Sequence, residues 1–323
     1  MKVEQSQGGS LSRLCLLSGY SRQSYYKRSL GQEEKPLKEE LIVQQVIGYR
    51  GLQPRIGGKK LFILIAPFIR QHQMKIGRDA FLTVLRKYGL LNKRRRGKPQ
   101  TTDSNHWMKK YPDLIKEWVP TASNQLWVSD ITYLTLCDAD AFLSLVTDAY
   151  SRKIVGFHVS KSLKAEGCIL ALQMAISGCS NIQGLIHHSD RGSQYCCGDY
   201  VDLLKSCEID ISMTQSGNPR DNAIAERVNG ILKMELLEPV FADLDTARAA
   251  VTQAVNTYNY FRPHSSISML TPALVHGRTL KLRRHWKNYF KTRLTKEVMN
   301  EPVINKNDQL FKKKKRSKKR KTC

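Results

Sequence analysis

The chain has 323 residues, of which 41% are hydrophobic, enough apolar surface for a sizeable core in two or three domains. Its 53 Lys and Arg against 28 Asp and Glu leave a formal net charge of +25, so we expect a polyanionic partner, either nucleic acid or an anionic membrane surface. Membrane is the weaker choice, because no run of about 18 apolar residues could span a bilayer and MKVEQSQGGS lacks the order of a signal peptide. We therefore expect a cytosolic globular protein.

The eight cysteines are scattered without a C-x-x-C pair, which predicts free thiols and no disulfide framework in a reducing compartment. The nearest approach to a zinc set is His187-His188 with Cys196-Cys197. Adjacent residues point in different directions in most backbones, and the usual spacers between zinc ligands are missing. We therefore expect no zinc site.

The N-terminal third carries patterns typical of a DNA-binding region. The segment LSRLCLLSGYSRQSYYKR, from Leu11, predicts a helix, a turn at Gly19 and a second helix, with the spacing of a helix-turn-helix, although short helical hairpins of this composition are common. A basic run, Lys93 to Lys98, precedes Pro99 and marks the first boundary. We expect residues 1–98 to form an N-terminal helix-turn-helix DNA-binding region.

Residues 79–91, DAFLTVLRKYGLL, predict one more helix in this region, with Asp79 as its N-cap and its end at Gly89. The helix is either a core helix or a recognition helix that enters DNA. One face would hold Phe81, Val84, Leu85 and Tyr88.

The middle third changes to the two-residue period of strands. Three strands at 126–136, 142–147 and 154–159, joined by tight turns, predict an antiparallel meander. The pattern then predicts a helix at 164–177, a strand at 184–188, a helix at 200–207 and a strand at 208–214. The order βββαβαβ predicts a mixed sheet with helices packed on it.

Two aspartates fit poorly as structural residues. Asp130 lies inside the first strand, on the face of Val128 and Thr132, where an uncompensated charge is costly to bury. A buried arginine partner or a hydroxyl network would be the structural explanation. Asp190 is more ambiguous, because Ser189-Asp190 could end a strand or cap a turn.

A third acid lies on a helix that follows a loop. Residues 216–222, SGNPRDN, have the composition of a mobile loop, and a helix is predicted from Ala223 to about Leu237. Its apolar face holds Ile224, Val228 and Ile231, and its opposite face holds Glu226, Asn229 and Lys233. A solvated helix face would also explain Glu226.

These three segments resemble a known signature. WVSDITYL, HSDRGSQY and GNPRDNAIAERVNGILKMELL contain the three acids, with 59 residues between the first two and 35 between the last two. This pattern resembles the DDE motif of the retroviral-integrase and transposase superfamily. YNYFRPHSSISMLTP, from Tyr258 to Pro272, and NQLWVSDITYL resemble the second-frame (OrfB) transposases of bacterial insertion sequences. The likeness covers roughly residues 40–276, while Pro54 to Leu61 matches more loosely than the core does.

The resemblance implies an α/β fold: an RNase H-like catalytic core at 120–280, with a mixed five-stranded sheet flanked by helices, preceded by the helical helix-turn-helix region. The basic C-terminal tail, 281–323, falls outside the resemblance. Residues 306–323 contain ten Lys and Arg and one Asp, so we expect this segment to be disordered and available to any phosphate backbone. In a eukaryotic context the same run could be a nuclear address.

The resemblance also implies the chemistry. Asp130, Asp190 and Glu226 would be the catalytic residues and the metal ligands, and three carboxylates suit Mg²⁺, with Mn²⁺ as a substitute. Two ions about 4 Å apart would bracket the scissile phosphate, with Asp130 bridging both. Water would nick DNA at the element's end, and the freed 3′-hydroxyl would then attack another phosphodiester.

Five further residues are expected to bind DNA: Lys233, Arg227, Arg191, Asn229 and Arg262. Lys233 and Arg227 could equally be plain surface cations. His187 and His188 could order a metal-bound phosphate or simply finish a strand. For Tyr258 to His264, a structural clamp is a better interpretation than direct catalysis.

The expected partners are DNA, as inverted-repeat ends and target, and an upstream-frame OrfA protein. We also expect a homo-oligomer on DNA, no membrane partner and a cytoplasmic, nucleoid-associated location. Two other functions stay open: a DNA-binding regulator with an inactive integrase core, and a nuclease of the same fold without transfer activity. Mg²⁺-dependent nicking and joining of terminal DNA would separate all three.

Overall fold

The computed structural model describes residues 10–92, 106–116, 118–215, 222–278 and 280, with the backbone alone for residues 27–35. The described residues all belong to one compact unit, Met1–Lys281. Three sequence predictions lie outside the described residues: the basic run 93–98, most of the loop at 216–222 and the tail beyond residue 280.

The chain's first described elements are two helices joined by a tight turn. Helix α1 (Leu11–Leu17) ends before Gly19, whose φ of 68° lies in the left-handed region that glycine adopts without strain. Helix α2 (Arg22–Leu52) begins where the Ser21 side chain accepts a hydrogen bond from the Ser24 amide at 3.1 Å. The predicted helix, turn and second helix are present, and α2 continues well beyond the predicted segment.

Helices α3 (Gly58–Gln71) and α4 (Arg78–Lys87) pack with the C-terminal half of α2. Leu61, Ile65 and Ile69 recur every four residues, so they form one buried stripe on α3. The shared core of these helices also contains Ile42, Val46, Ile56, Phe81, Val84 and Leu85.

Two details of the predicted helix at 79–91 were wrong. The N-cap position is Gly77, and Asp79 lies in the first turn, where it pairs with the neighbouring Arg78. Tyr88 is 40% exposed at the helix end and does not share the buried face. Because that face, formed by Phe81, Val84 and Leu85, is buried, the structure supports the core-helix interpretation.

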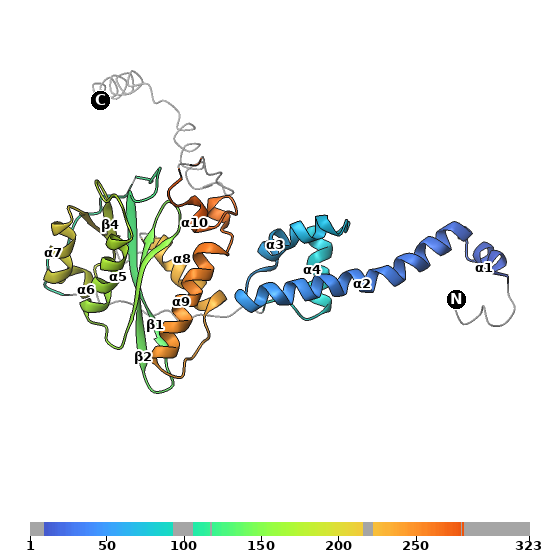
Figure 1. The fold of residues 1–323 in the computed structure, drawn as a ribbon, viewed down its shortest axis with the longest axis horizontal. Coiled ribbons are helices and arrows are strands. Elements are labelled where there is room, and N and C mark those ends of the chain that lie inside the picture. The colour runs from blue at the N-terminus through green and yellow to red at the C-terminus, as the bar shows by residue number, and fades with distance from the viewer. Residues whose placement is uncertain (1–9, 93–105, 117, 216–221, 279, 281–323) are drawn as a thin grey trace, which may run out of the picture. The chain divides into compact units, whose positions relative to one another are not determined.

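The predicted mixed five-stranded sheet is confirmed (Figure 1). Its strands are β1 (Leu126–Thr135), β2 (Asp140–Asp148), β3 (Ile154–Ser160), β4 (Ile186–Ser189) and β5 (Asp210–Met213). They lie in the order β3-β2-β1-β4-β5, antiparallel from β3 to β1 and parallel from β1 to β5. The first three strands form the predicted meander, and the arrangement is RNase H-like.

Helices cover both faces of this sheet. On one face are α5 (Ala165–Ser177), α6 (Ser193–Cys196) and α7 (Gly198–Ser206). On the other are α8 (Ala223–Ile231), a π-helical turn η3 (Leu232–Leu236) and α9 (Leu244–Tyr260). The chain continues through η4 (Ser265–Ile267) to α10 (Pro272–Val275), where Pro272 is the first helical residue and the Thr271 side chain makes no capping bond.

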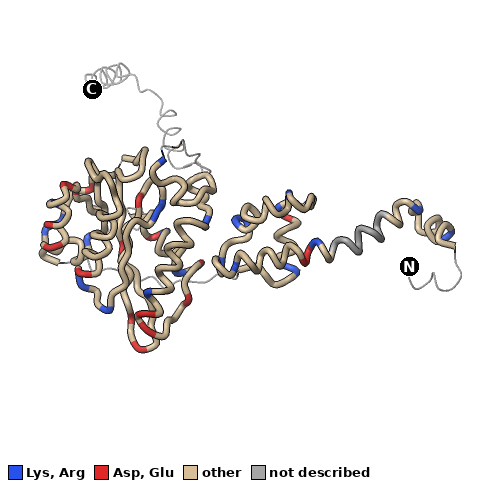
Figure 2. Tube along the Cα trace, viewed as in Figure 1, with Lys and Arg blue, Asp and Glu red and all other residues tan. Residues whose placement is uncertain are grey.

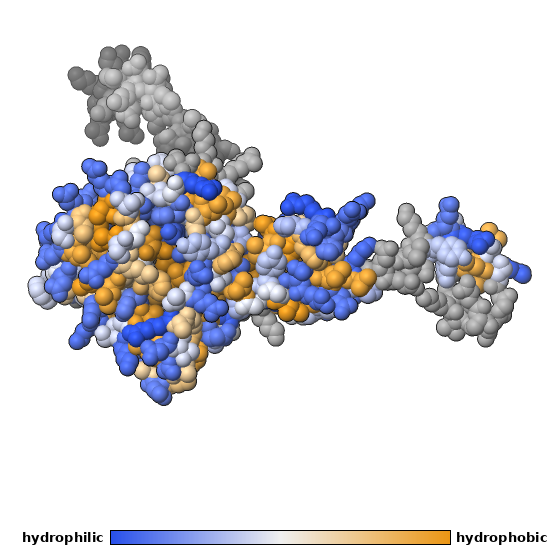
Figure 3. Space-filling view, viewed as in Figure 1, coloured by the Kyte–Doolittle hydropathy of each residue, from blue (hydrophilic) through white to orange (hydrophobic). Residues whose placement is uncertain are grey.

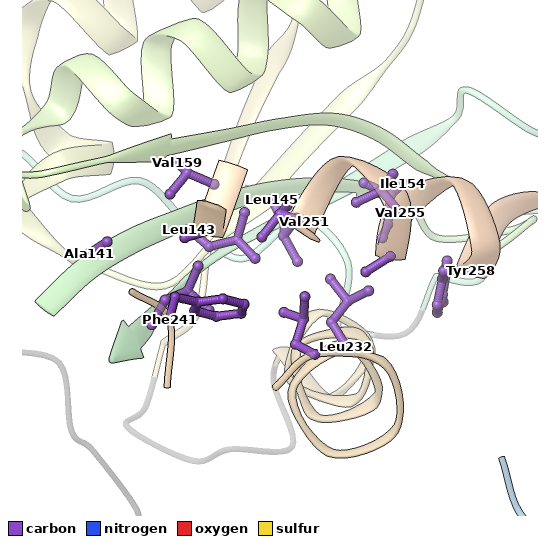
Figure 4. Packing of buried hydrophobic residues seen from close by; sticks show 14 of the residues in the cluster. Ala141, Leu143, Leu145, Ile154, Val159, Leu232, Phe241, Val251, Val255 and Tyr258 are labelled. Carbon is purple, nitrogen blue, oxygen red and sulfur yellow. The ribbon is translucent and has the colours of Figure 1, made fainter. Parts of the chain in front are cut away.

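The alternation of β2 explains why two cores form. Leu143 and Leu145 point into the core beneath α8 and α9, where Figure 4 shows them near Leu232 and Phe241. Val146 points the other way, into the core beneath α5 and α7. Each face of the sheet is therefore buried beneath helices.

The surface carries both polar and apolar residues. Figure 3 shows hydrophobic residues interspersed with hydrophilic ones, and Figure 2 shows acidic residues gathered at the tip where β1 turns into β2. Asp138 and Asp140 are both exposed at this tip. Within the described ranges, no helix is long and apolar enough to cross a membrane.

Candidate active site

Two aspartates lie side by side where the central parallel strands β1 and β4 pair. Val128 of β1 pairs with His188 of β4, and continuing that register by two residues sets Asp190 beside Asp130. Neighbouring strands lie about 4.8 Å apart, and residues two positions along a strand return to the same face. The two carboxylates therefore share one face, Asp130 within β1 and Asp190 directly after β4.

Helix α8 lies over the same part of β1 and carries the third acid. Ala225 packs in one apolar cluster with Val128. The Asn222 side chain donates to the Ser129 carbonyl at 2.9 Å, and the Asn229 side chain donates to Asp130 Oδ2 at 2.7 Å. Glu226 follows Asn222 by four residues and precedes Asn229 by three, so the three side chains share one side of the helix.

The charges of the other two acids act on Asp130. Burial, together with the charge of Asp190 and a smaller effect from Glu226, raises the pKa of Asp130 to about 7. Hydrogen bonds from Asn229 and from the Ile131 amide oppose this rise. Glu226 is exposed on α8, and the part of its carboxylate that is shielded from solvent raises its pKa. A bound cation would relieve this repulsion and restore the charged carboxylates.

The described residues do not include a group of three His, Cys, Asp or Glu side chains already close enough to hold a metal ion. Asp130 is held by Asn229, and Asp190 Oδ1 accepts the Gly192 amide at 3.0 Å, so Asp190 does cap a turn. The site thus has an aspartate pair with Glu226 on the helix above it.

The nearby imidazoles point into the interior, which leaves the carboxylate oxygens as donors. Oxygen donors suit a hard cation. His187 and His188 are both fully buried. His187 Nε2 lies 2.7 Å from Ser129 Oγ and 2.9 Å from the Tyr200 hydroxyl, while His188 Nδ1 lies 2.8 Å from Ser212 Oγ. Burial lowers the pKa of His187 to about 3, so this ring is neutral. The geometry supports the interpretation that the two histidines complete a strand.

Two of the residues predicted to bind DNA lie at the aspartate pair. Arg191 follows Asp190 and is half-buried; its carbonyl lies 2.7 Å from His106 Nε2, and its Nε has no hydrogen-bond partner among the described residues. Asn229 is 5% exposed, and its amide is committed to Asp130. In this structure, Asn229 therefore serves the carboxylate rather than the surface.

The other three lie elsewhere. Arg227 is exposed on α8. Lys233 is half-buried on η3, and burial lowers its pKa although the charge of Asp140 acts to raise it. Arg262 is only 1% exposed, and its guanidinium makes two hydrogen bonds of 2.9 Å to the Glu235 carboxylate. A buried, paired guanidinium is not available to DNA, so for Arg262 the clamp interpretation fits and the prediction of a DNA contact does not.

Comparison with known proteins adds the family. Residues 120–219 and 207–272 each match the integrase core domain family. A 31 kDa uncharacterized protein of insertion element IS600 from Shigella sonnei is 31% identical, covering 80% of this chain and 96% of the relative. Transposase InsF of insertion sequence IS3A from Escherichia coli K12 is 32% identical, covering 61% of this chain and 69% of the relative.

The chain belongs to the insertion-sequence transposase family. A putative transposase of IS986/IS6110 from Mycobacterium tuberculosis is a further relative of this insertion-sequence transposase, 29% identical over 64% of this chain and 76% of the relative. Among solved structures, the HTLV-2 integrase catalytic core domain in complex with magnesium is 21% identical, covering 49% of this chain and 99% of that chain, with a TM-score of 0.39. This last likeness is too distant to carry an argument about the transposase site.

Proposed function

We propose that the chain is a transposase that cleaves DNA at the ends of an insertion sequence and joins those ends to target DNA, with Asp130, Asp190 and Glu226 as catalytic residues and metal ligands. The observation that carries this proposal is the placement of Asp130, on β1, beside Asp190, directly after the neighbouring strand β4, beneath the anchored helix of Glu226. Two adjacent carboxylates repel each other unless a cation lies between them.

The three carboxylates would hold Mg²⁺, or Mn²⁺ in its place, and we propose two ions. The chemistry that such ions supply when bound is activation of the attacking oxygen and stabilisation of the leaving oxygen of a phosphodiester. The chain's own contribution is position: β1 and β4 fix the aspartates, and two amide hydrogen bonds fix α8 over them. Arg191 directly follows Asp190 in the sequence, and its guanidinium would bind a DNA phosphate beside the aspartate pair.

Outside the pair, Arg227 and Lys233 are proposed to contact DNA along the helix that carries Glu226. The net charge of +25 supports binding to inverted-repeat ends and to target DNA, which would place the chain on the nucleoid. A homo-oligomer on DNA and an upstream-frame OrfA partner complete the proposal.

The test is a cleavage and joining assay on terminal-repeat DNA with Mg²⁺. The variants Asp130→Asn, Asp190→Asn and Glu226→Gln are expected to lose at least about 100-fold in both reactions, because each removes a charge needed to hold the cation. DNA binding, measured by gel shift, should survive. Asp202→Asn is the matched control, since Asp202 is exposed on α7. Joining at the wild-type rate by any of the three variants would refute the ligand assignment.

A DNA-binding regulator with an inactive core is the alternative function. The intact aspartate pair and the two amide anchors of α8 count against it, because a regulator has no need to keep repelling carboxylates together. A wild-type chain that binds terminal DNA without nicking it in Mg²⁺ or Mn²⁺ would favour the regulator. Nicked product without joined product would favour a nuclease.

A further inference from the structure

The helix that carries Glu226 does not end as the sequence predicts. Its α-helical part stops at Ile231, and residues Leu232–Leu236 form a π-helical turn, in which the Leu237 amide bonds to the Leu232 carbonyl at 2.8 Å. π-helical turns are rare and occur often at functional sites. Tertiary contacts must therefore stabilise this end of the helix.

Arg55, in the loop before α3, supplies part of that stabilisation. Its Nε donates to the Met234 carbonyl at 2.8 Å, its Nη2 donates to the Leu237 carbonyl, and its amide donates to the Glu235 carbonyl at 3.1 Å. The last carbonyls of a helix lack partners within the helix, and a cation there also interacts favourably with the helix dipole. Arg55 thus caps the C-terminal end of the helix of Glu226.

The Glu235 side chain is a second attachment point. Arg262, from the segment after α9, makes two hydrogen bonds of 2.9 Å to it, and Lys60, in the first turn of α3, lies 3.4 Å away. The side chains of Lys60 and Glu235 are only 16% and 20% exposed. Ion pairs with so little solvent gain little net stability, because desolvation offsets most of the attraction, but they fix geometry closely.

We propose that Arg55, Lys60 and Arg262 are positioning residues for Glu226. Through Glu235 and the carbonyls of η3, they fix the far end of the helix, while Asn222 and Asn229 fix the end over the aspartate pair. Glu235 follows Glu226 by nine residues, about 13 Å along a helix, so a small rotation at Glu235 is transmitted to Glu226. Because Arg55 lies in the loop before α3 and Lys60 in its first turn, the N-terminal helices control the placement of the Glu226 carboxylate.

This inference rests on the proposed function, and Lys60→Met tests it. The substitution removes the charge and keeps most of the side chain's length. We expect the single-turnover rate of end joining at saturating DNA to fall about ten- to hundred-fold, with DNA affinity within about two-fold of wild type. Lys60→Arg should restore most of the rate. Lys59→Met is the matched control, because Lys59 is the exposed neighbour on the same helix.

Hydrogen exchange gives a readout that does not need activity. Amides of residues 223–236 should exchange faster in Lys60→Met than in Lys59→Met, while amides of the sheet keep wild-type rates. If Lys60→Met fails to fold, Glu235→Gln carries the same test, since it keeps the shape of the side chain and loses its charge. Combining the two substitutions should have no more effect than Glu235→Gln alone, because Lys60 acts through Glu235, which also pairs with Arg262.

Two results would overturn the inference: a wild-type joining rate with unchanged exchange, or a loss of DNA affinity as large as the loss of rate, which would make Lys60 a plain DNA contact. A wild-type chain that joins no DNA would overturn the proposed function instead. In that case the exchange of residues 223–236 still decides whether Lys60 holds the helix.

Discussion

Asp130 shows how a strand accommodates a charge that its surroundings disfavour. Burial and the charge of Asp190 both disfavour its ionised carboxylate. Hydrogen bonds from the Asn229 side chain and the Ile131 backbone amide stabilise the charge in part. This compensation is incomplete, as the raised pKa shows. Two hydrogen bonds thus hold the carboxylate in place.

Asn229→Asp would turn that compensation into repulsion. The new carboxylate at position 229 would lie close to Asp130 Oδ2, to which the Asn229 amide now donates at 2.7 Å. We expect the free energy of unfolding to fall by about 1–3 kcal/mol without divalent cations, and millimolar Mg²⁺ to restore part of it. Urea unfolding with Mg²⁺ and with EDTA measures both effects. Asn256→Asp, exposed on α9, should change neither, and equal behaviour of the two variants would contradict the assigned contact.

At this scale the sequence predicts the acids better than their supports. Asp130, Asp190 and Glu226 stay a prediction that the family resemblance indicates, since each acid by itself also has a structural explanation. Asn229 was assigned to DNA because helix periodicity put it on a polar face, yet it is buried against a residue 99 positions away. Arg262 and Glu235 were not paired, since nothing in their own segments indicates a partner.

At the scale of elements, one glycine determines how closely a helix approaches the sheet. A Cβ on Gly156 of β3 would lie 2.0 Å from the Ala171 carbonyl oxygen of α5. Neither backbone can yield easily, so α5 packs where it does because this position has no side chain.

Gly156→Ala should therefore lower the free energy of unfolding by about 3 kcal/mol or more. Gly230→Ala is the contrasting variant: Gly230 is exposed within α8, and nothing lies within 4 Å of its added Cβ. A helical alanine there should raise stability by up to about 1 kcal/mol. Urea unfolding of both variants tests the pair, and destabilisation of similar size in both would argue against the close approach at Gly156.

The strands and α5 were predictable because alternation and the helical period are carried by neighbouring residues. Helix α3 was not predicted, since Pro67 interrupts LFILIAPF and a long apolar run has no clear period. The predicted helix does continue to about Leu237, but its last residues, Leu232–Leu236, are π-helical and not α-helical. Arg55 donates to the Met234 carbonyl of this π-helical turn across 179 residues of sequence, and no local pattern indicates such a contact.

At the scale of the molecule, the charge is the most informative feature of the composition. Ten of the 53 Lys and Arg lie in residues 306–323. If Lys312 to Lys321 binds phosphates without regard to sequence, its deletion should make the slope of log affinity against log salt shallower by about 0.9 for each phosphate that the tail had neutralised. Binding to terminal-repeat and unrelated DNA at several salt concentrations checks this. A weakening confined to the terminal repeat would show that the tail reads sequence.

The parallel pairing of β1 with β4 also determines when the site comes into existence. These strands are separated by the β2–β3 meander and α5, so the aspartate pair is a contact between distant parts of the chain. Contacts of this kind form late, because a long loop must close before they can stabilise anything. A chain still being synthesised, with Asp130 already folded into its hairpin, has no partner for that carboxylate. The proposed cleavage and joining of DNA would therefore begin only when both strands are in place.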